Sequence, residues 1–274
     1  MSNVSNDIRV FFSSAVFSFR AQFDWLNPPM WLTMKLVLSL SQMAFFVFVG
    51  TFASTSTGNT VPLQQLVAYI AIGNALQSLS WNTVFSVINI TGHDKWDGTL
   101  PLLLATPAHR LPLFIGRAMI HVLDGLLSVV IGFAFAAFLF GVNFGSTDPL
   151  ALGVTVLLTA FTMAGFGLLV GGLSFHFRNP MVFANIFTFI LLIFCGVNFP
   201  IEALPSFLQP LSYAFPLSYG TTAARYAMQG STLVQLSPIL VEQIIVGLVA
   251  MLIGYYFFQA FERSARKTGK LEAI

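Results

Sequence analysis

"LVLSLSQMAFFVFVG", residues 36–50, belongs to a stretch from Leu36 to His93 that contains no Asp, Glu, Lys or Arg. The whole chain has the same character, because 56% of its 274 residues are hydrophobic and only 8% are charged. An ordinary soluble domain carries roughly 25% charged residues. A single aqueous core cannot bury so much apolar surface, so the sequence predicts an integral membrane protein whose solvent is largely lipid.

Long apolar segments predict the number of membrane spans. A helix needs ~20 mostly apolar residues to cross the hydrocarbon core of a bilayer. The segments lack the alternating pattern of a membrane β-barrel. We therefore expect an all-α polytopic membrane protein, in which residues 1–274 form one transmembrane domain and residues 32–261 form a six-helix bundle. The six expected spans are approximately 32–53, 63–91, 112–141, 149–175, 181–198 and 238–261.

Basic residues predict the orientation of this bundle. Six spans place both termini on the same side of the membrane. If that side is the cytoplasm, all 12 Lys and Arg residues except Arg225 fall in inner segments or at inner span ends, as the positive-inside rule requires. We expect both termini, including the tail at 262–274, to be cytoplasmic.

The first 30 residues predict an amphipathic helix that ends before the prolines at 28 and 29. Such a helix suits the inner headgroup layer of a membrane. A one-sided helix packed against protein is the alternative. One face would carry Phe12, Val16, Phe19 and Phe23, and another would carry Arg9, Ser13 and Arg20.

The segment between the last two expected spans, residues 198–230, is apolar for an outer loop. It contains four prolines, with Glu202 and Arg225 as its only charged residues. Another full span is excluded because freed backbone groups in lipid are costly. We expect a re-entrant helical hairpin that dips into the outer leaflet and is covered by neighbouring helices. An amphipathic lid lying flat outside is the alternative.

Residues 92–117, GHDKWDGTLPLLLATPAHRLPLFIGR, interrupt the apolar pattern on the inner side. Thr99 can cap a short helix with Pro101 in its first turn, and the following leucines form an apolar face. A helix projecting into the cytosol would need a protein partner for these leucines. The residues alone leave two alternatives open: a docking element, or a helix tucked beneath the protein's own bundle.

Two blocks of this sequence resemble type 2 ABC exporter permeases, the ABC-2 transmembrane domain family. WDGTLPLLLATPAHRLPLFIGR (96–117) resembles the cytoplasmic segment of that family. CGVNFPIEALPSFLQPLSYAFPLSYGTTAAR (195–225) resembles its proline-rich block between the last two spans. The order of the blocks and the six-span layout match as well. The family commonly has an acidic residue after Gly-Thr-Leu, where this chain has Pro101.

The resemblance implies that the loop at 92–111 is a coupling helix that docks on a separate nucleotide-binding ATPase subunit. That subunit would bind ATP and Mg. This chain has no G-x-x-x-x-G-K-[ST] phosphate-binding motif, so we expect it to have no enzymatic activity and no cofactor of its own. A second permease chain, identical or related, is a further implied partner. The residues implied in coupling are Asp97, Gly98, Thr99, Leu100, Leu102, Leu103, Pro107 and Arg110.

A polar stripe in the second expected span indicates a face that avoids lipid. Four residues, Asn74, Ser78, Asn82 and Ser86, recur every four positions, which places them on one side of a helix. The stripe lines a substrate path or forms hydrogen bonds between helices, and the sequence leaves both alternatives open. With residues from the first and fifth spans, the candidate path comprises Ser39, Gln42, Asn74, Gln77, Asn82, Phe183, Asn185 and Phe187.

Two ionisable residues, His121 and Asp124, lie inside the third expected span. An ionisable side chain in a membrane is costly and is by default a functional hypothesis. We favour a structural role in which Asp124 pairs with His121 or with an Asn of the polar stripe. A role in proton coupling is the alternative.

Together these features predict the permease subunit of an ATP-driven ABC exporter in a bacterial-type plasma (inner) membrane. Its substrate would be hydrophobic or amphipathic: a drug, antibiotic, lipid or natural product. Export of a polysaccharide or lipid-linked glycan is an alternative within the family, and a proton-coupled secondary transporter is an alternative of another class. The sequence has no metal-ligand cluster and no basic run typical of a nucleic-acid surface, so membrane lipid is an expected partner and nucleic acid is not.

Overall fold

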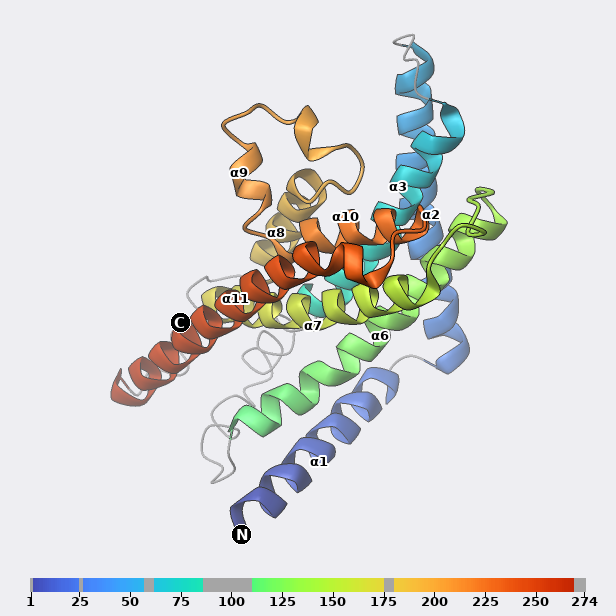
Figure 1. The fold of residues 1–274 in the computed structure, drawn as a ribbon. Helices are drawn as coiled ribbons and strands as arrows, with labels where there is room; N and C mark the ends of the chain where they lie inside the picture. Colours follow the sequence, from blue (N-terminus) through green and yellow to red (C-terminus); the bar gives the residue numbers. More distant parts are fainter. Residues whose placement is uncertain (1, 25–26, 57–61, 86–109, 175–179, 269–274) are drawn as a thin grey trace.

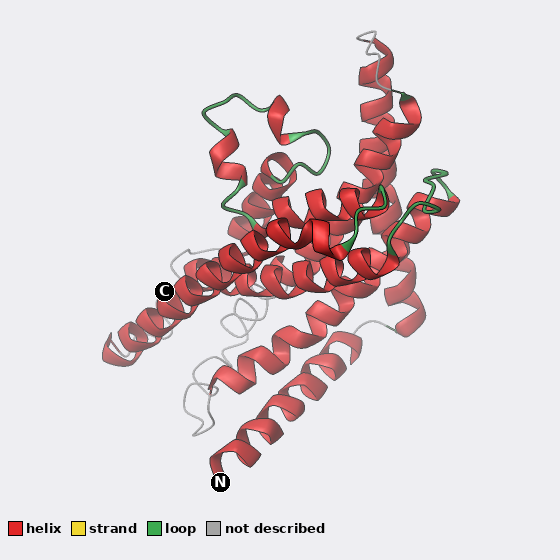
Figure 2. Ribbon diagram, in the orientation of Figure 1, coloured by secondary structure: helices red, strands yellow, loops and turns green. Residues whose placement is uncertain are grey.

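The computed structural model describes residues 2–24, 27–56, 62–85, 110–174 and 180–268, which form helices joined by turns and loops (Figures 1 and 2). No strand occurs in these ranges, and the expected all-α class is confirmed. The long helices are α1 (Ser2–Asp24), α2 (Pro28–Ser56), α3 (Leu63–Ser80), α6 (Arg110–Phe138), α7 (Pro149–Ser174), α8 (Pro180–Phe194) and α11 (Leu233–Thr268). The shorter elements are the π-helix η1 (Trp81–Phe85), the 3-10 helix η2 (Ile201–Ala203), α9 (Gln209–Ser212) and α10 (Pro216–Met228).

Within the described ranges, four helical segments have the length and composition needed to cross a membrane, namely Pro28–Ser56, Met119–Phe138, Pro149–Ser174 and Leu233–Phe257. They correspond to the first, third, fourth and sixth expected spans. The second expected span is formed by α3 and η1 as far as Phe85, and the fifth contains α8, which has 15 residues. The count of six spans stays a prediction.

The core of the bundle surrounds α3. This helix contacts α2, α6, α7, α8 and α10, and every residue from Ile70 to Gln77 is buried. A helix that is apolar nearly all round is stable only when it is enclosed. The few polar side chains of α3 must therefore find partners within the protein.

The helices α7 and α11 lie side by side (Figure 1) and form a tight interface. Glycines allow the close approach, because a Cβ on Gly254 would overlap the backbone nitrogen of Leu169, and one on Gly247 would overlap the side chain of Thr162. The buried amide of Gln243 donates hydrogen bonds to Thr159 Oγ1 and Thr162 Oγ1 at 2.9 and 3.2 Å. Small residues and interhelical hydrogen bonds are the usual means of joining helices in lipid.

The helix α1 lies alongside the first half of α6 (Figure 1). Gly116 of α6 lies directly against α1, because a Cβ there would overlap the carbonyl oxygen of Phe11 and the hydroxyl of Ser14. On another face, Phe12 and Phe17 are 62% and 70% exposed. The predicted helix is therefore present and packs against protein on one side. The location of its phenylalanine face in the headgroup layer stays a prediction.

The outer segment at 198–230 contains η2, α9 and α10. The helix α10 contacts α3, α7 and α11, and its residues Leu217, Ala223 and Ala224 are fully buried. By contrast, η2 and α9 lie at the periphery, beyond the outer end of α8 (Figure 1). Neighbouring helices thus cover α10, and its insertion into the outer leaflet stays a prediction.

Candidate transport site

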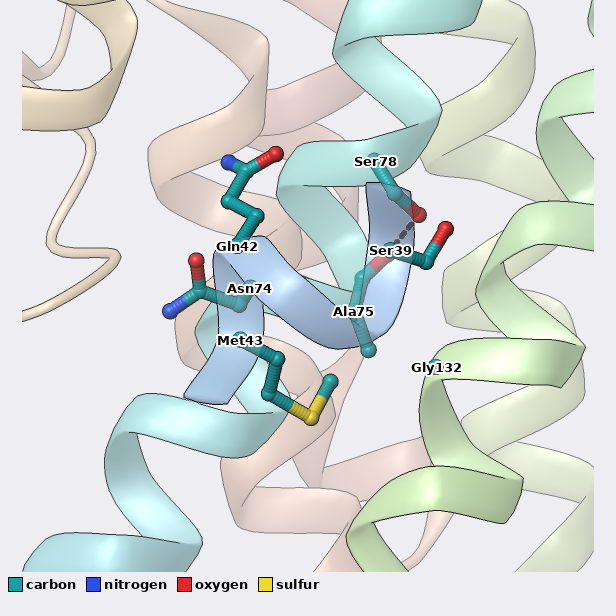
Figure 3. A pocket seen from close by; sticks show the side chains of 7 residues that line it. All are labelled: Ser39, Gln42, Met43, Asn74, Ala75, Ser78 and Gly132. Carbon is teal, nitrogen blue, oxygen red and sulfur yellow. Dashed lines mark hydrogen bonds between the residues drawn. The ribbon is translucent and has the colours of Figure 1, made fainter. Parts of the chain in front are cut away.

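A small polar pocket lies between α2, α3 and α6 (Figure 3). The space between these helices is about 220 Å³ with the open solvent at its mouth included. It has room for about one water-sized polar group, and a drug-sized molecule would need further space. The lining residues are Ser39, Gln42 and Met43 of α2, Asn74, Ala75 and Ser78 of α3, and Gly132 of α6.

Helical spacing brings these residues together. Ser39 and Gln42 are three positions apart on α2, and Asn74 and Ser78 are four apart on α3, so each pair shares a helix face. Gly132 lets α6 approach closely, because a Cβ there would lie 2.8 Å from the Cβ of Ala75. In Figure 3 the amides of Gln42 and Asn74 project to the same side of α2.

Asn74 is held in place and still offers a hydrogen-bond acceptor. Asn74 is only 4% exposed. Its Nδ2 donates to the carbonyl oxygen of Ile70 at 2.9 Å and to Asn198 Oδ1 at 2.8 Å. Its own Oδ1 is buried and accepts no hydrogen bond from the described part of the chain. A buried acceptor without a partner is unfavourable, so a donor on a ligand or a water molecule would be stabilised here.

None of the seven lining residues is ionisable. Their amides and hydroxyls supply both donors and acceptors. The pocket therefore suits an uncharged polar group, such as a hydroxyl or an amide, and it has no counter-charge for a phosphate or an ammonium group.

The pocket contains three of the eight candidate path residues, Ser39, Gln42 and Asn74. Two others contact neighbouring helices instead. Gln77 is 1% exposed, and its Nε2 lies 3.5 Å from the carbonyl oxygen of Thr188 on α8. Asn82 Nδ2 donates to Ser128 Oγ of α6 at 3.0 Å and to the backbone of its own helix. Contact of these two residues with a substrate stays a prediction.

The candidate path residues of α8 lie apart from the pocket lining. Phe183 and Phe187 have ring centroids 5.2 Å apart, and Phe187 contacts Phe166 of α7 at 6.0 Å. Phe166 in turn contacts Phe215, just before α10, at 5.7 Å. These rings form an aromatic cluster among α7, α8 and α10. Asn185 lies on the same helix and is not a lining residue of the pocket.

The structure corrects the expected partner of Asp124. Its carboxylate forms an ion pair with Lys35 of α2, rather than with His121 or an Asn of the polar stripe. Lys35 Nζ also donates to the backbone oxygen of Asp124 at 2.9 Å. The two side chains are only 8% and 11% exposed. The partner is Lys35, a residue that the sequence placed merely at the inner end of a span, and the choice between a structural role and proton coupling for His121 and Asp124 stays a prediction.

The turn that follows α8, on the expected outer side, is tied to α3 and α10. Gly196 has a φ of +63°, a conformation that favours glycine. We call residues 195–198 the outer turn. Each of its four residues accepts a side-chain hydrogen bond: Thr221 donates to Cys195 O at 2.9 Å, Tyr69 to Gly196 O at 3.0 Å, Arg225 to Val197 O at 3.0 Å, and Asn74 to Asn198 Oδ1 at 2.8 Å.

Arg225 was missed by sequence reasoning as a structural residue. Its Nη2 donates to the carbonyl oxygens of Tyr69 and Val197, each at 3.0 Å, and its guanidinium carbon lies 3.4 Å from the centroid of the Tyr69 ring. Burial lowers the pKa of Arg225 to about 10, so the side chain is protonated at neutral pH. The available signal was that Arg225 is the only basic residue on the expected outer side.

The coupling residues expected at Asp97, Gly98, Thr99, Leu100, Leu102, Leu103 and Pro107 lie outside the described residues. Arg110 is the first residue of α6, and its side chain is not described. Their role in coupling stays a prediction.

The helical bundle and its apolar spans define the class of this molecule as a helical membrane protein. Comparison with known proteins identifies the family. The sequence profile described as "ABC-2 type transporter" matches residues 15–229, which is most of the chain, and the chain belongs to this family. The resemblance seen in the two sequence blocks is thereby confirmed, and the chain is a multi-pass membrane protein.

Two curated relatives match about half of the chain. The "Probable multidrug ABC transporter permease YbhR" of Escherichia coli (strain K12) is 26% identical over 128 residues, which cover 47% of this chain and 34% of the relative. The "Linearmycin resistance permease protein LnrN" of Bacillus subtilis (strain 168) is 27% identical over 139 residues, which cover 50% of this chain and 33% of the relative. The match thus spans about a third of the length of each relative.

Proposed function

We propose that this chain is the membrane permease subunit of an ATP-driven ABC exporter. Its substrate is a hydrophobic or amphipathic molecule, such as a drug, antibiotic, lipid or natural product, taken from the cytoplasm or the inner leaflet. The observation that carries the proposal is the family match over residues 15–229. The names of the two relatives, a probable multidrug permease and a resistance permease, favour this substrate class.

The pocket supports an amphipathic substrate. Its lining is polar and uncharged, while nearby helices expose large apolar side chains, including Phe45 and Phe48 of α2 at 61% and 67%. An uncharged polar group of the substrate would bind Gln42 and Asn74, and its apolar body would lie against lipid-facing side chains. Burial of apolar surface stabilises such binding by roughly 25 cal/mol per Å².

We propose six spans in the plasma (inner) membrane, with both termini cytoplasmic and the segment at 198–230 re-entrant from outside. Four apolar helices, the α3–η1 pair and α8 support this arrangement. The contacts of Arg225 support it too, because backbone carbonyls and an aromatic ring satisfy this one basic residue of the outer side. Such a residue does not require the cytoplasm for solvation.

Two partners complete the proposed exporter. A second permease chain would enlarge the substrate site, because the pocket of about 220 Å³ in one chain is too small for a drug-sized molecule. A nucleotide-binding ATPase subunit would bind ATP and Mg and dock on the loop at 92–111. This chain would then supply the path and no catalytic residue.

The ATPase partnership is tested by purifying the full chain from its native membrane and measuring which ATPase subunit accompanies it. We expect Leu102→Asp and Leu103→Asp to remove that subunit, because a buried carboxylate disrupts an apolar docking face. Leu211→Asp is the matched control, since Leu211 is 45% exposed on α9, in the segment that we propose to lie on the other side of the membrane. Retention of the subunit by both leucine variants, or its absence from the unaltered chain, would contradict the proposal.

A further inference from the structure

We propose that the ion pair between Lys35 and Asp124 is a positioning contact that makes α2 and α6 move as one body. A displacement of the inner part of α6 would then move α2 as well, and so move the residues of both helices that line the polar pocket. The inference rests on the proposed function, because it concerns how ATP-driven movement arrives at the substrate.

The contact has a defined geometry. Lys35 Nζ binds both the carboxylate of Asp124 and its backbone oxygen, so the lysine is fixed to the body of α6 as well as to a side chain. Both side chains are nearly buried. A buried ion pair adds little net stability compared with apolar residues of similar volume, and its best-attested use is to specify one arrangement of helices.

Further contacts fix each partner within its own helix. Lys35 Nζ lies 4.9 Å from the centroid of the Trp31 ring. The backbone oxygen of Asp124 also accepts a hydrogen bond from Ser128 Oγ at 3.0 Å, and Ser128 accepts one from Asn82 of η1 at 3.0 Å. The pair therefore belongs to a network that joins α2, α6 and η1.

The pair and the pocket lie on the same faces of both helices. On α2, Ser39 follows Lys35 by four positions, and on α6, Ser128 and Gly132 follow Asp124 at intervals of four. Residues four apart stack on one helix face. At 1.5 Å per residue, Ser39 lies roughly 6 Å beyond Lys35 along α2, and Gly132 lies roughly 12 Å beyond Asp124 along α6. A helix held at the pair and moved as a rigid rod would displace Ser39 and Gly132 together.

The helix α6 is placed to receive such a movement. It begins at Arg110, the last of the residues implied in coupling, and α1 is packed against it at Gly116. The pair lies between this inner part of α6 and the pocket. Loss of the pair would leave the pocket intact and would uncouple α2 from the displacement of α6.

The test uses the full chain with its ATPase subunit in proteoliposomes and measures substrate molecules moved per ATP hydrolysed. The double variant Lys35→Met with Asp124→Leu replaces the pair by apolar side chains, so it is expected to fold and keep its thermal stability. We expect its transport per ATP to fall roughly three- to thirtyfold, the range seen when a coupling contact is removed. The exchange variant Lys35→Asp with Asp124→Lys is expected to recover most of the ratio.

A cross-link distinguishes a positioning contact from a gate that must open. In a Cys195→Ala background, which removes the only cysteine, Lys35→Cys and Asp124→Cys are joined by a short thiol-reactive cross-linker. We expect the joined pair to transport better than the unjoined one. The inference would be overturned if cross-linking abolished transport. It would also be overturned if the Lys35→Met with Asp124→Leu variant still transported and moved as many substrate molecules per ATP as the unaltered chain. Neither result would bear on the proposed function. Absence of ATP-driven transport by the unaltered complex would refute the proposed function as well.

Discussion

The interface between α7 and α11 and the interface between α2 and α6 are built on opposite principles. The first uses glycines at close backbone contact and neutral hydrogen bonds from Gln243 to two threonines. The second has a buried ion pair at one end and an open polar pocket at the other. Close backbone contact leaves no alternative packing, whereas a pocket leaves space into which side chains can move.

This difference divides the bundle into two parts. We call the closely packed helices α7, α10 and α11 the frame, and the helices α2, α3 and α6, which line the pocket, the pocket side. The helices α7, α10 and α11 pack closely on one another, and the side-chain hydrogen bonds between α7 and α11 come from the neutral amide of Gln243. The helices α2, α3 and α6 carry the ion pair, the unpaired Asn74 acceptor and the pocket. Buried acceptors without a partner among the described residues occur in both parts, at Asn74 Oδ1 and at Gln243 Oε1, so the proposed substrate contact of α2, α3 and α6 rests on the pocket.

The largest expected effect comes from breaking the ion pair on one side only. In Asp124→Leu, Lys35 would remain buried without its counter-charge, and the loss should be about 3 to 5 kcal/mol in the free energy of unfolding. The measurement is thermal unfolding of the detergent-solubilised protein, with Lys35→Met plus Asp124→Leu as the control that restores stability. If the free energy of unfolding falls no more than it does after substitution of an exposed residue, water solvates the pair.

Overpacking the frame should have the next largest effect. A side chain at Gly254 meets the backbone of Leu169, which cannot turn aside, so Gly254→Leu should lower the free energy of unfolding by about 3 kcal/mol. Gly153→Leu in α7 is the matched control, because a Cβ there has nothing within 4 Å. Equal stability of the two variants would contradict the close contact of α7 with α11.

Weakening the outer turn should have an intermediate effect. Arg225→Lys keeps the charge but loses the guanidinium geometry that reaches two carbonyls and stacks on Tyr69, with an expected loss of about 2 kcal/mol. Tyr69→Phe removes only the hydrogen bond to Gly196 and should lose about 1 kcal/mol. Thermal unfolding of both variants measures these losses. A larger loss in Tyr69→Phe than in Arg225→Lys would show that the contacts of Arg225 are not the main ones that hold the outer turn.

The smallest effect on stability, and a specific effect on transport, is expected in the pocket. Gln42→Met preserves size and should change the free energy of unfolding by less than about 0.5 kcal/mol. Loss of one hydrogen bond to the substrate should weaken its apparent affinity by about three- to tenfold. Leu38→Met, at a residue that is 67% exposed, is the control in the same transport assay. Equal affinity in the two variants would remove Gln42 from the site.

Much of the fold followed from local pattern. Apolar length predicted spans that begin near residues 32, 149 and 181, and the described helices α2, α7 and α8 begin at Pro28, Pro149 and Pro180. The close contacts of α11 with α7 were not located from the sequence: a Cβ on Gly247 would overlap Thr162, and one on Gly254 would overlap the backbone of Leu169.

The candidate site was harder to predict, because contacts between residues far apart in the sequence produce no pattern within a short segment. Ser39, Gln42 and Asn74 were found because polar residues on an apolar helix face are conspicuous. Asp124 was conspicuous too, but its partner Lys35 lies 89 positions away, and no periodicity relates them. The same is true of Arg225, whose acceptors at Tyr69 and Val197 are brought near only by the packing of α10 on α3.

The central claim is that nucleotide hydrolysis by a partner drives substrate through this chain. The most direct measurement is accumulation of a hydrophobic fluorescent dye in proteoliposomes that contain the purified chain and its ATPase subunit. We predict accumulation that requires ATP and Mg and that stops when the ATPase subunit is left out. Dye movement by this chain alone under a proton gradient, without ATP, would contradict the claim.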